Sequence, residues 1–275
     1  MNTASQPIGV FDSGIGGLTV AHALAKRLPN EQLIYFGDTA HLPYGDKSAD
    51  AIRYFCLKIG KFLLEQNCKC IVIACNSAAA TAGQVMREFF GNSVPIIDVI
   101  EPLVQHVAAQ ARYRKVGVIA TKATIGSGVY ERRLRELRPQ SLDIAALATP
   151  LLVPMIEEGF FKNNISRTII DAYLANETLQ GIDALLLACT HYPLIHKEIA
   201  AFYDNKIDVL DSNTVAAEAV AAALTRLGLL STERAAPHRF LVSDYTDSFD
   251  YTARLFYPNE KFHLELHNIW EERLS

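Results

Sequence analysis

The chain has 275 residues, half of them hydrophobic and a fifth charged, and its formal net charge is −4. This length and balance are typical of a globular protein with one large domain or two ordinary ones. The acidic charge argues against nucleic acid as a partner, because a phosphate-binding surface usually leaves a basic excess. Two local basic runs, 112–115 and 131–138, are interpreted as solvated helix faces.

The first residues of the chain and its cysteines indicate the cellular compartment in which the protein is expected. Residues 1–14 lack the basic segment and the apolar core of a secretory signal, and no apolar run is long enough to span a bilayer. The five cysteines lack the spacing of a disulfide framework, which indicates reduced thiols. Cys68 and Cys70 are not joined by the further Cys or His ligands of a zinc site. We therefore expect a cytoplasmic protein with no membrane segment and no metal.

Short apolar runs alternate with longer amphipathic stretches in the first hundred residues. Four runs rich in β-branched and aromatic residues predict strands at 8–13, 33–38, 71–75 and 94–99. Residues 48–67 have the periodicity of a helix, with Ser48 as the expected N-cap. This alternation predicts parallel α/β sheets with helices on both faces.

The second half of the chain repeats the plan of the first half. Three pairs of equivalent positions follow one another in the same order at nearly constant separation: Gly9 and Gly117, Cys75 and Cys189, and Asp98 and Asp211. We therefore expect two pseudo-symmetric α/β domains, each with a parallel sheet, that face each other across a shared cleft.

The remaining tail does not belong to the second repeat. It contains an expected helix at 214–228, an expected strand at 239–244 and a last helical piece. A tail with one strand most simply completes the first domain. We therefore expect a discontinuous first domain, 1–98 plus 211–275, and a second domain at 99–210.

Cys75 and Cys189 are predicted at the carboxyl ends of equivalent strands, the edge of an α/β sheet at which functional loops gather. Either thiol alone would most simply be a small buried apolar side chain. Each thiol is, however, followed by hydrogen-bonding residues, and the repeat would place the two thiols on opposite walls of one cleft. Two thiols in this arrangement suit the inversion of a stereocentre, since one removes a proton from one face and the other returns a proton to the opposite face. A free Cys has a pKa of about 8.5, so both of its protonation states are accessible after modest tuning.

The other predicted strand ends carry groups that could hold a ligand. These candidate binding residues are Asp12, Ser13, Tyr44, Gly45, Thr121 and Thr124. The glycines after Ser13 open a helix N-terminus suited to a carboxylate or phosphate, although a tight strand-to-helix turn explains them equally well. The polar loop at 37–46 would, taken alone, be a surface connection.

Six segments together resemble the bacterial glutamate racemase family, which belongs to the cofactor-independent aspartate/glutamate racemases. They are GVFDSGIGGLTV, YFGDTAHLPYG, ACNSA, GVIAT, VPMIEEG and ACTHYPL, and the resemblance extends from about residue 7 to residue 212. It implies an isomerase with two facing α/β domains that needs no cofactor. It also implies that the substrate is L- or D-glutamate and that the D-glutamate formed supplies peptidoglycan synthesis.

The resemblance also implies roles for individual residues. Cys75 would take the α-proton from D-glutamate and Cys189 from L-glutamate, with help from Asp12 and His191. A glutamate of the VPMIEEG segment would assist as well, and its position favours Glu157 over the adjacent Glu158. The implied substrate contacts are Asp12, Ser13, Tyr44, Gly45, Asn76, Ser77, Thr190 and His191.

Three other functions are weighed against this one. A nucleotide-binding oxidoreductase would explain the glycines and Asp38 at the end of the second strand, but Thr19 replaces the last glycine of that fingerprint. A non-catalytic amino-acid-binding module would not need a thiol in each domain. An aspartate racemase would use the same two-thiol chemistry, and no sequence motif determines the length of the substrate side chain that the site accepts. A homodimer is left open, because the sequence does not fix the oligomeric state.

Overall fold

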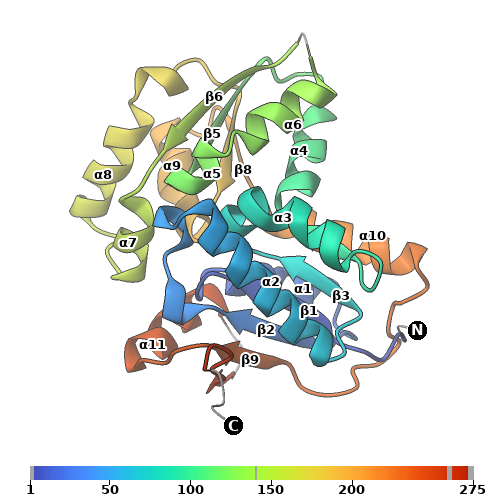
Figure 1. Cartoon of the computed structure of the whole chain (residues 1–275). Helices are drawn as coiled ribbons and strands as arrows, with labels where there is room; N and C mark the ends of the chain where they lie inside the picture. The colour runs from blue at the N-terminus through green and yellow to red at the C-terminus, as the bar shows by residue number, and fades with distance from the viewer. Residues whose placement is uncertain (1–2, 140, 259–261, 272–275) are drawn as a thin grey trace.

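The computed structural model describes residues 3–139, 141–258 and 262–271, and its strands form two parallel sheets in two lobes (Figure 1). The sheet of the first lobe has the order β10-β9-β2-β1-β3-β4. Its strands are β1 (Ile8–Asp12), β2 (Leu33–Gly37), β3 (Cys70–Ile73), β4 (Ile96–Asp98), β9 (Arg239–Val242) and β10 (Leu264–Leu266). The predicted α/β class is thereby confirmed.

The sheet of the second lobe has the order β6-β5-β7-β8. Its strands are β5 (Lys115–Ala120), β6 (Asp143–Ala148), β7 (Ala184–Ala188) and β8 (Asp208–Asp211). This order is the same as that of β2-β1-β3-β4 in the first lobe, so β3 and β7 occupy equivalent places beside the central strand. The internal repeat in the sequence therefore corresponds to two sheets of the same topology.

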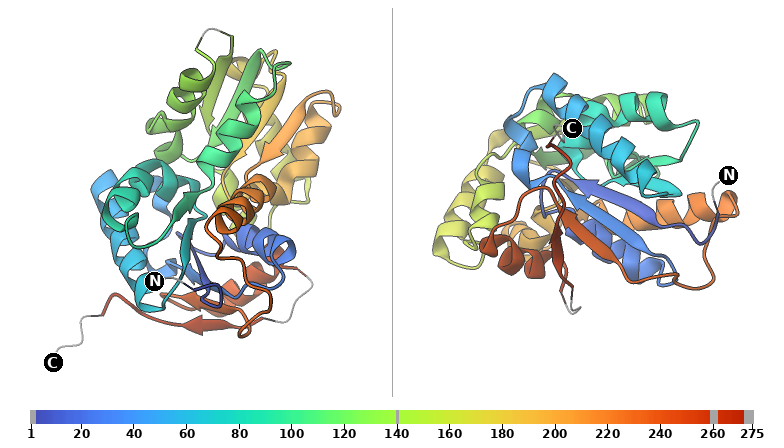
Figure 2. Two further views of the ribbon diagram at one scale, coloured as in Figure 1. Left: turned by 90° about the vertical axis from the view of Figure 1, so that its right-hand side faces the viewer. Right: turned by 60° about the horizontal axis from the view of Figure 1, so that its bottom comes forward.

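Eleven α-helices connect the strands within the described residues, and Figure 2 shows helices on both faces of the sheets, including between the two lobes. They are α1 (Leu18–Arg27), α2 (Ala49–Glu65), α3 (Asn76–Phe90), α4 (Ile100–Ala108), α5 (Lys122–Gly126), α6 (Val129–Leu137), α7 (Leu152–Glu157), α8 (Asn164–Leu174), α9 (His196–Phe202), α10 (Asn213–Arg226) and α11 (Asp247–Phe256). Short 3₁₀ turns lie at η1 (Thr39–His41), η2 (Tyr44–Asp46), η3 (Glu177–Leu179) and η4 (Tyr192–Ile195).

The predicted elements form for the expected local reasons. All five residues of β1, β2 and β7 are buried, as in parallel strands covered on both faces. Helix α2 begins directly after Ser48, whose hydroxyl accepts a hydrogen bond from the backbone N–H of Ala51 at 3.3 Å. Within the described residues, no helix combines the length and the apolar character that crossing a bilayer requires.

The tail differs from the prediction in its number of strands. Beyond β9, the described part of the tail contains a further strand, β10, which pairs in parallel with β9 at the outer edge of the first sheet. A strand of three residues is too short for hydrophobic periodicity to reveal. Both tail strands join the sheet of the first lobe, which is compatible with a discontinuous first domain, and the exact domain limits stay a prediction. The structure does not describe residues 1–2, 140, 259–261 and 272–275, which belong to the two expected domains.

One ion pair is buried in the first lobe. The Nζ of Lys69 lies 2.6 Å from Glu31 Oε2, and the two side chains are 0% and 2% exposed. Lys69 also donates to the backbone carbonyls of Ala4 at 2.5 Å and Leu229 at 2.8 Å. This single ammonium therefore ties the N-terminal segment and the segment after α10 to the core.

Candidate active site

Both predicted strand-end cysteines line a single cavity. Eleven of the predicted site residues line it: Ser13, Tyr44, Gly45, Cys75, Asn76, Ser77, Thr121, Glu157, Cys189, Thr190 and His191. Two predicted residues, Asp12 and Thr124, do not line it and are buried at 0% and 1% exposure. The prediction missed five lining residues that carry no polar side chain: Gly14, Leu42, Pro43, Val153 and Ala188.

Cys75 follows β3 and is the N-cap of α3. Its sulfur accepts a hydrogen bond from the N–H of Ala78 at 3.4 Å and donates to Ser13 Oγ at 3.5 Å. Burial raises the pKa of the Cys75 thiol to about 12, the charge of Asp12 adds to this rise, and the bonds to Ser13 and Ala78 oppose it. A negative charge on Cys189 would raise the pKa of Cys75 further. Without a ligand, Cys75 is therefore a neutral thiol aimed from a helix N-terminus that would stabilise its anion.

Cys189 follows β7 directly and is paired with an imidazole. Its sulfur lies 3.7 Å from His191 Nδ1, and His191 Nε2 lies 2.9 Å from Glu157 Oε1. Burial lowers the pKa of His191, but the contacts with Cys189 and Glu157 together outweigh burial, so that the pKa lies well above 6.5. Glu158, the alternative considered from the sequence, is exposed. An imidazolium held by Glu157 would thus stand beside Cys189.

Asp12 lies at the end of β1, behind the cavity wall. Its Oδ2 accepts the backbone N–H of Gly14 at 3.1 Å, whereas its buried Oδ1 has no hydrogen-bond partner among the described residues. Burial raises the pKa of this carboxyl, and the charge of His191 lowers it. Asp12 therefore couples electrostatically to both sides of the site, since it also acts on the Cys75 thiol.

Hydroxyl groups join the two lobes at the cavity. Ser77 Oγ lies 2.8 Å from Thr121 Oγ1 and 3.4 Å from Thr124 Oγ1, and the two threonine oxygens are 3.2 Å apart. Ser77 belongs to the first turn of α3, and Thr121 is the N-cap of α5. Two helix starts, one from each lobe, therefore meet at this point.

Asn76 is oriented by a tyrosine that the sequence did not single out. The hydroxyl of Tyr130 donates to Asn76 Oδ1 at 2.7 Å, and Tyr130 is 3% exposed. The amide nitrogen of Asn76 is buried without a hydrogen-bond partner in the described part of the chain. An acceptor group of a ligand would satisfy this donor. Tyr130 adjoins the basic run 131–138, and no local pattern distinguishes it from other buried helical aromatics.

Gly16 lies directly against the loop of the other lobe that carries Thr190 and His191. A Cβ at Gly16 would lie 2.4 Å from Cε1 of His191 and 2.6 Å from Oγ1 of Thr190. The hydroxyl of Thr19 donates to the carbonyl of Thr190 at 3.1 Å. At Gly16, therefore, the missing side chain makes room for the protein's own histidine, an explanation that the sequence pattern alone did not suggest.

No group of three His, Cys, Asp or Glu side chains in the described ranges could hold a metal ion. Asp38, the acidic residue of the nucleotide-binding interpretation, is engaged within the protein, because Tyr44 donates a hydrogen bond to its Oδ2 and Ser243 and Trp270 donate to its Oδ1.

Comparison with known proteins places this geometry in a family. Residues 18–220 match the family model described as Asp/Glu/hydantoin racemase. The glutamate racemase of Neisseria meningitidis serogroup C is 45% identical over 87% of this chain and 88% of its own length. That of Chlorobaculum tepidum is 40% identical over 96% and 97%.

A solved structure agrees over almost the whole fold. The crystal structure of glutamate racemase from Francisella tularensis subsp. tularensis SCHU S4, in complex with D-glutamate, has a TM-score of 0.90 and 38% identity over 97% of this chain and 99% of that one. Since the family model spans most of the chain and relatives align over nearly all of it, the chain belongs to the Asp/Glu/hydantoin racemase family and is an enzyme of the racemase class.

Proposed function

We propose that this enzyme interconverts L- and D-glutamate by proton transfer at the α-carbon, with Cys75 and Cys189 as the two bases. The observation that carries the proposal is that thiols from equivalent strand ends of two lobes line one cavity, each with its own partners. The substrate is inferred from the relatives, which are glutamate racemases at 40% and 45% identity, and from the D-glutamate bound in the Francisella structure.

The chemistry follows from the partners of each thiol. With L-glutamate, Cys189 acts as the thiolate, stabilised by the imidazolium of His191, and removes the α-proton. Cys75 acts as the thiol and delivers its own proton to the opposite face. The product is D-glutamate, Cys189 is left as a thiol, and Cys75 is left as a thiolate at the N-terminus of α3. The reaction from D-glutamate runs through the same groups in reverse.

The carbanion-like transition state needs positive charge and hydrogen-bond donors near the α-carboxylate. The unpartnered amide nitrogen of Asn76 and the hydroxyls of Ser77, Thr121 and Thr190 are available for a carboxylate. The buried charge of Asp12 would favour the substrate ammonium, and that ammonium would in turn lower the high pKa of Cys75. Binding of D-glutamate would therefore favour the thiolate form of Cys75, which removes the α-proton of that enantiomer.

We assign this activity to the supply of D-glutamate for peptidoglycan and place it in the cytoplasm. The bacterial sources of the related racemases support the first assignment. The five free cysteines support the second, because thiols persist in a reducing compartment.

Proton NMR in heavy water tests the reaction and the substrate together. We expect the α-proton signal of L-glutamate to disappear as D-glutamate forms, and L-aspartate to keep its signal under the same conditions. Exchange with aspartate alone would refute the choice of substrate. Exchange with neither amino acid would refute the proposed function.

Substitution of the thiols tests the mechanism. We expect Cys75→Ala and Cys189→Ala each to abolish racemisation, because one base cannot both remove a proton and return one to the other face. Cys70→Ala is the matched control, since Cys70 is buried in the same strand that leads to Cys75 and is expected to affect stability alone. Racemisation at the parental rate by either active-site variant would exclude the two-base mechanism.

A liganded crystal structure tests the geometry. Proton transfer requires a reacting distance of about 3–3.5 Å between heavy atoms, so the two sulfurs should lie about 6–8 Å apart with the α-carbon between them. Sulfurs on the same face of the substrate would rule out inversion by this pair.

A further inference from the structure

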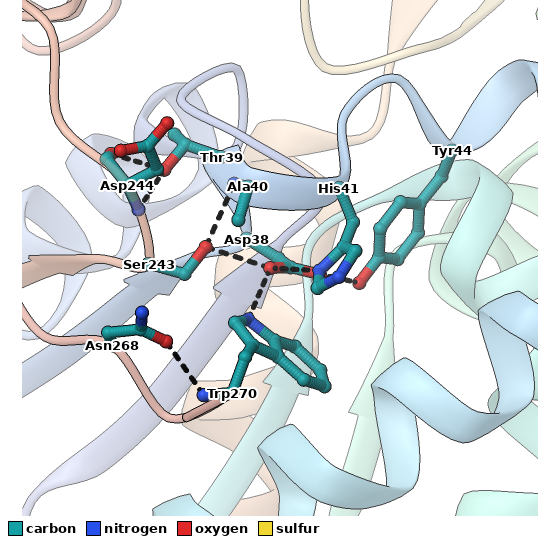
Figure 3. Close-up of polar contacts among 9 residues, drawn as sticks. All are labelled: Asp38, Thr39, Ala40, His41, Tyr44, Ser243, Asp244, Asn268 and Trp270. Atoms are coloured by element: carbon teal, nitrogen blue, oxygen red, sulfur yellow. Dashed lines mark hydrogen bonds and ion pairs between the residues drawn. The ribbon is translucent and has the colours of Figure 1, made fainter. Parts of the chain in front are cut away.

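A buried carboxylate lies behind the cavity wall formed by the segment 42–45. Asp38 is 0% exposed and directly follows β2. Its Oδ2 accepts the hydroxyl of Tyr44 at 2.7 Å, and its Oδ1 accepts the hydroxyl of Ser243 at 2.8 Å and the indole N–H of Trp270 at 2.9 Å. Nδ1 of His41 lies 3.0 Å from both oxygens (Figure 3). Hydrogen bonds to this one charge thus come from the active-site loop, the end of β9 and the C-terminal tail.

The indole of Trp270 is held in place from several sides. Its ring meets the ring of His41 edge-on at a centroid distance of 4.4 Å and that of Phe55 at 5.4 Å. Its backbone N–H donates to the side chain of Asn268 at 2.8 Å, as Figure 3 shows. The preceding residues are fixed as well, because β10 pairs with β9. The tail therefore presents the indole to Asp38 in a defined position.

The active-site loop depends on the same carboxylate. Tyr44 and Gly45 line the cavity, and Tyr44 is 1% exposed. Because its hydroxyl donates to Asp38, Tyr44 faces the cavity with its ring rather than with a free hydroxyl. A second connection runs from the loop to the residue that follows β9, because the N–H of Ala40 donates to Ser243 Oγ at 3.0 Å. The position of this wall is therefore set by how Asp38 is held.

We infer that Trp270 is a positioning residue of the racemase, which completes the hydrogen bonding of Asp38 and so fixes the wall that carries Tyr44 and Gly45. A buried carboxylate that loses a donor is poorly compensated and shifts toward its remaining partners or admits water. Because two of those partners, Tyr44 and His41, belong to the loop, such a shift moves the cavity wall. The inference rests on the proposed function, from which the substrate of the assay is taken.

The composition of the chain offers a direct probe of this site. Trp270 is the only tryptophan in the sequence. The intrinsic fluorescence that is excited above 295 nm therefore comes from the indole beside Asp38. We expect saturating D-glutamate to change this emission in the parent protein, because a substrate that presses on Tyr44 acts on the shared carboxylate. We expect Tyr44→Phe, which removes the hydroxyl between the loop and Asp38, to abolish the response. An emission that is insensitive to D-glutamate in the parent would overturn the inference.

Kinetics of tail variants supply the second test. Trp270→Phe keeps an aromatic ring but removes the N–H, and we expect kcat/KM to fall about tenfold, the low end of the loss of a hydrogen bond to a charged group. Leu266→Ala is the control, since Leu266 lies in the same tail and is 62% exposed. We expect it to retain parental kinetics.

The outcomes separate positioning from simple stabilisation. Thermal unfolding is measured on all variants, and the assays are run well below every midpoint, where a merely structural residue leaves kcat/KM unchanged. A folded Trp270→Phe protein with parental kcat/KM would overturn this inference alone. A parent protein that leaves the α-proton of glutamate in place would overturn the proposed function, and this inference with it.

Discussion

Replacing Gly16 with Ala should displace the imidazole of His191 without removing any side chain of the active site. The added Cβ would lie 2.4 Å from His191 Cε1 and 2.6 Å from His191 Nδ1, whereas ordinary contact begins at 3.4 Å. The ring must therefore move by about 1 Å, or the turn after β1 must move instead. A displacement of about 1 Å at a catalytic group can cost about 100-fold in rate, which corresponds to about 2.7 kcal/mol of transition-state stabilisation.

The displacement acts on both contacts of the imidazole. It changes the 3.7 Å separation from the sulfur of Cys189 and the 2.9 Å separation from Glu157. We expect kcat/KM to fall about 100-fold in both directions, because racemisation uses the same thiol in each direction. The assay is racemisation of each enantiomer, followed by circular dichroism, together with thermal unfolding of each variant.

Gly126→Ala is the matched control. Gly126 lies in α5, and a Cβ there would meet no atom within 4 Å, so its kinetics should equal those of the parent. A folded Gly16→Ala protein with kcat/KM within about threefold of the parent would refute the reasoning. In that case the turn, and not the imidazole, would have absorbed the clash.

Three further predictions concern charge and protonation. Glu157→Gln should lower the pKa of the His191 imidazole, because the hydrogen bond and the charge of Glu157 both raise it. The alkaline limb of the kcat/KM profile against pH should then move to lower pH. Glu158→Gln is the control and should leave this profile unchanged. Lys69→Met should lower the free energy of unfolding in urea by about 3–5 kcal/mol, because it leaves the buried charge of Glu31 unpaired. Adding Glu31→Leu should restore most of the lost stability. A loss below about 1 kcal/mol would contradict a buried ion pair. The pKa of Cys75 is raised to about 12. The rate of its alkylation by iodoacetamide should therefore increase about tenfold per pH unit between about pH 7 and 10, as measured by peptide mass spectrometry. A rate that levels off near pH 8.5 would indicate an ordinary thiol.

The fold and the pairing of the two thiols could be predicted because they depend on local patterns. Continuous apolar runs predicted the parallel strands, and the polar residues after each run marked the strand ends, where Cys75 and Cys189 lie. The internal repeat then indicated that both ends face one cavity, and both thiols line it. The short strand β10 was missed because three residues carry too little periodicity.

The supporting contacts were decided by tertiary structure alone. Two adjacent carboxylates have the same local sequence context, and only the packing of α7 directs Glu157 to His191 and leaves Glu158 exposed. The hydrogen bond from Tyr130 to Asn76 joins residues 54 positions apart, and no pattern within either helix encodes it.

Local sequence patterns were enough to predict the class of fold, the duplicated sheet and a thiol at each of two equivalent strand ends, because hydrophobic runs and turn residues act over a few neighbouring positions. These patterns do not specify which hydrogen bonds and packing contacts hold the two strand ends in place. The carboxylate of Asp38 is bonded to the indole of Trp270 across 232 positions, and the missing side chain of Gly16 is explained only by His191 in the other lobe. Such contacts arise when two lobes and a tail pack together, since a buried charge or a close approach takes its partner from whatever segment the fold brings near.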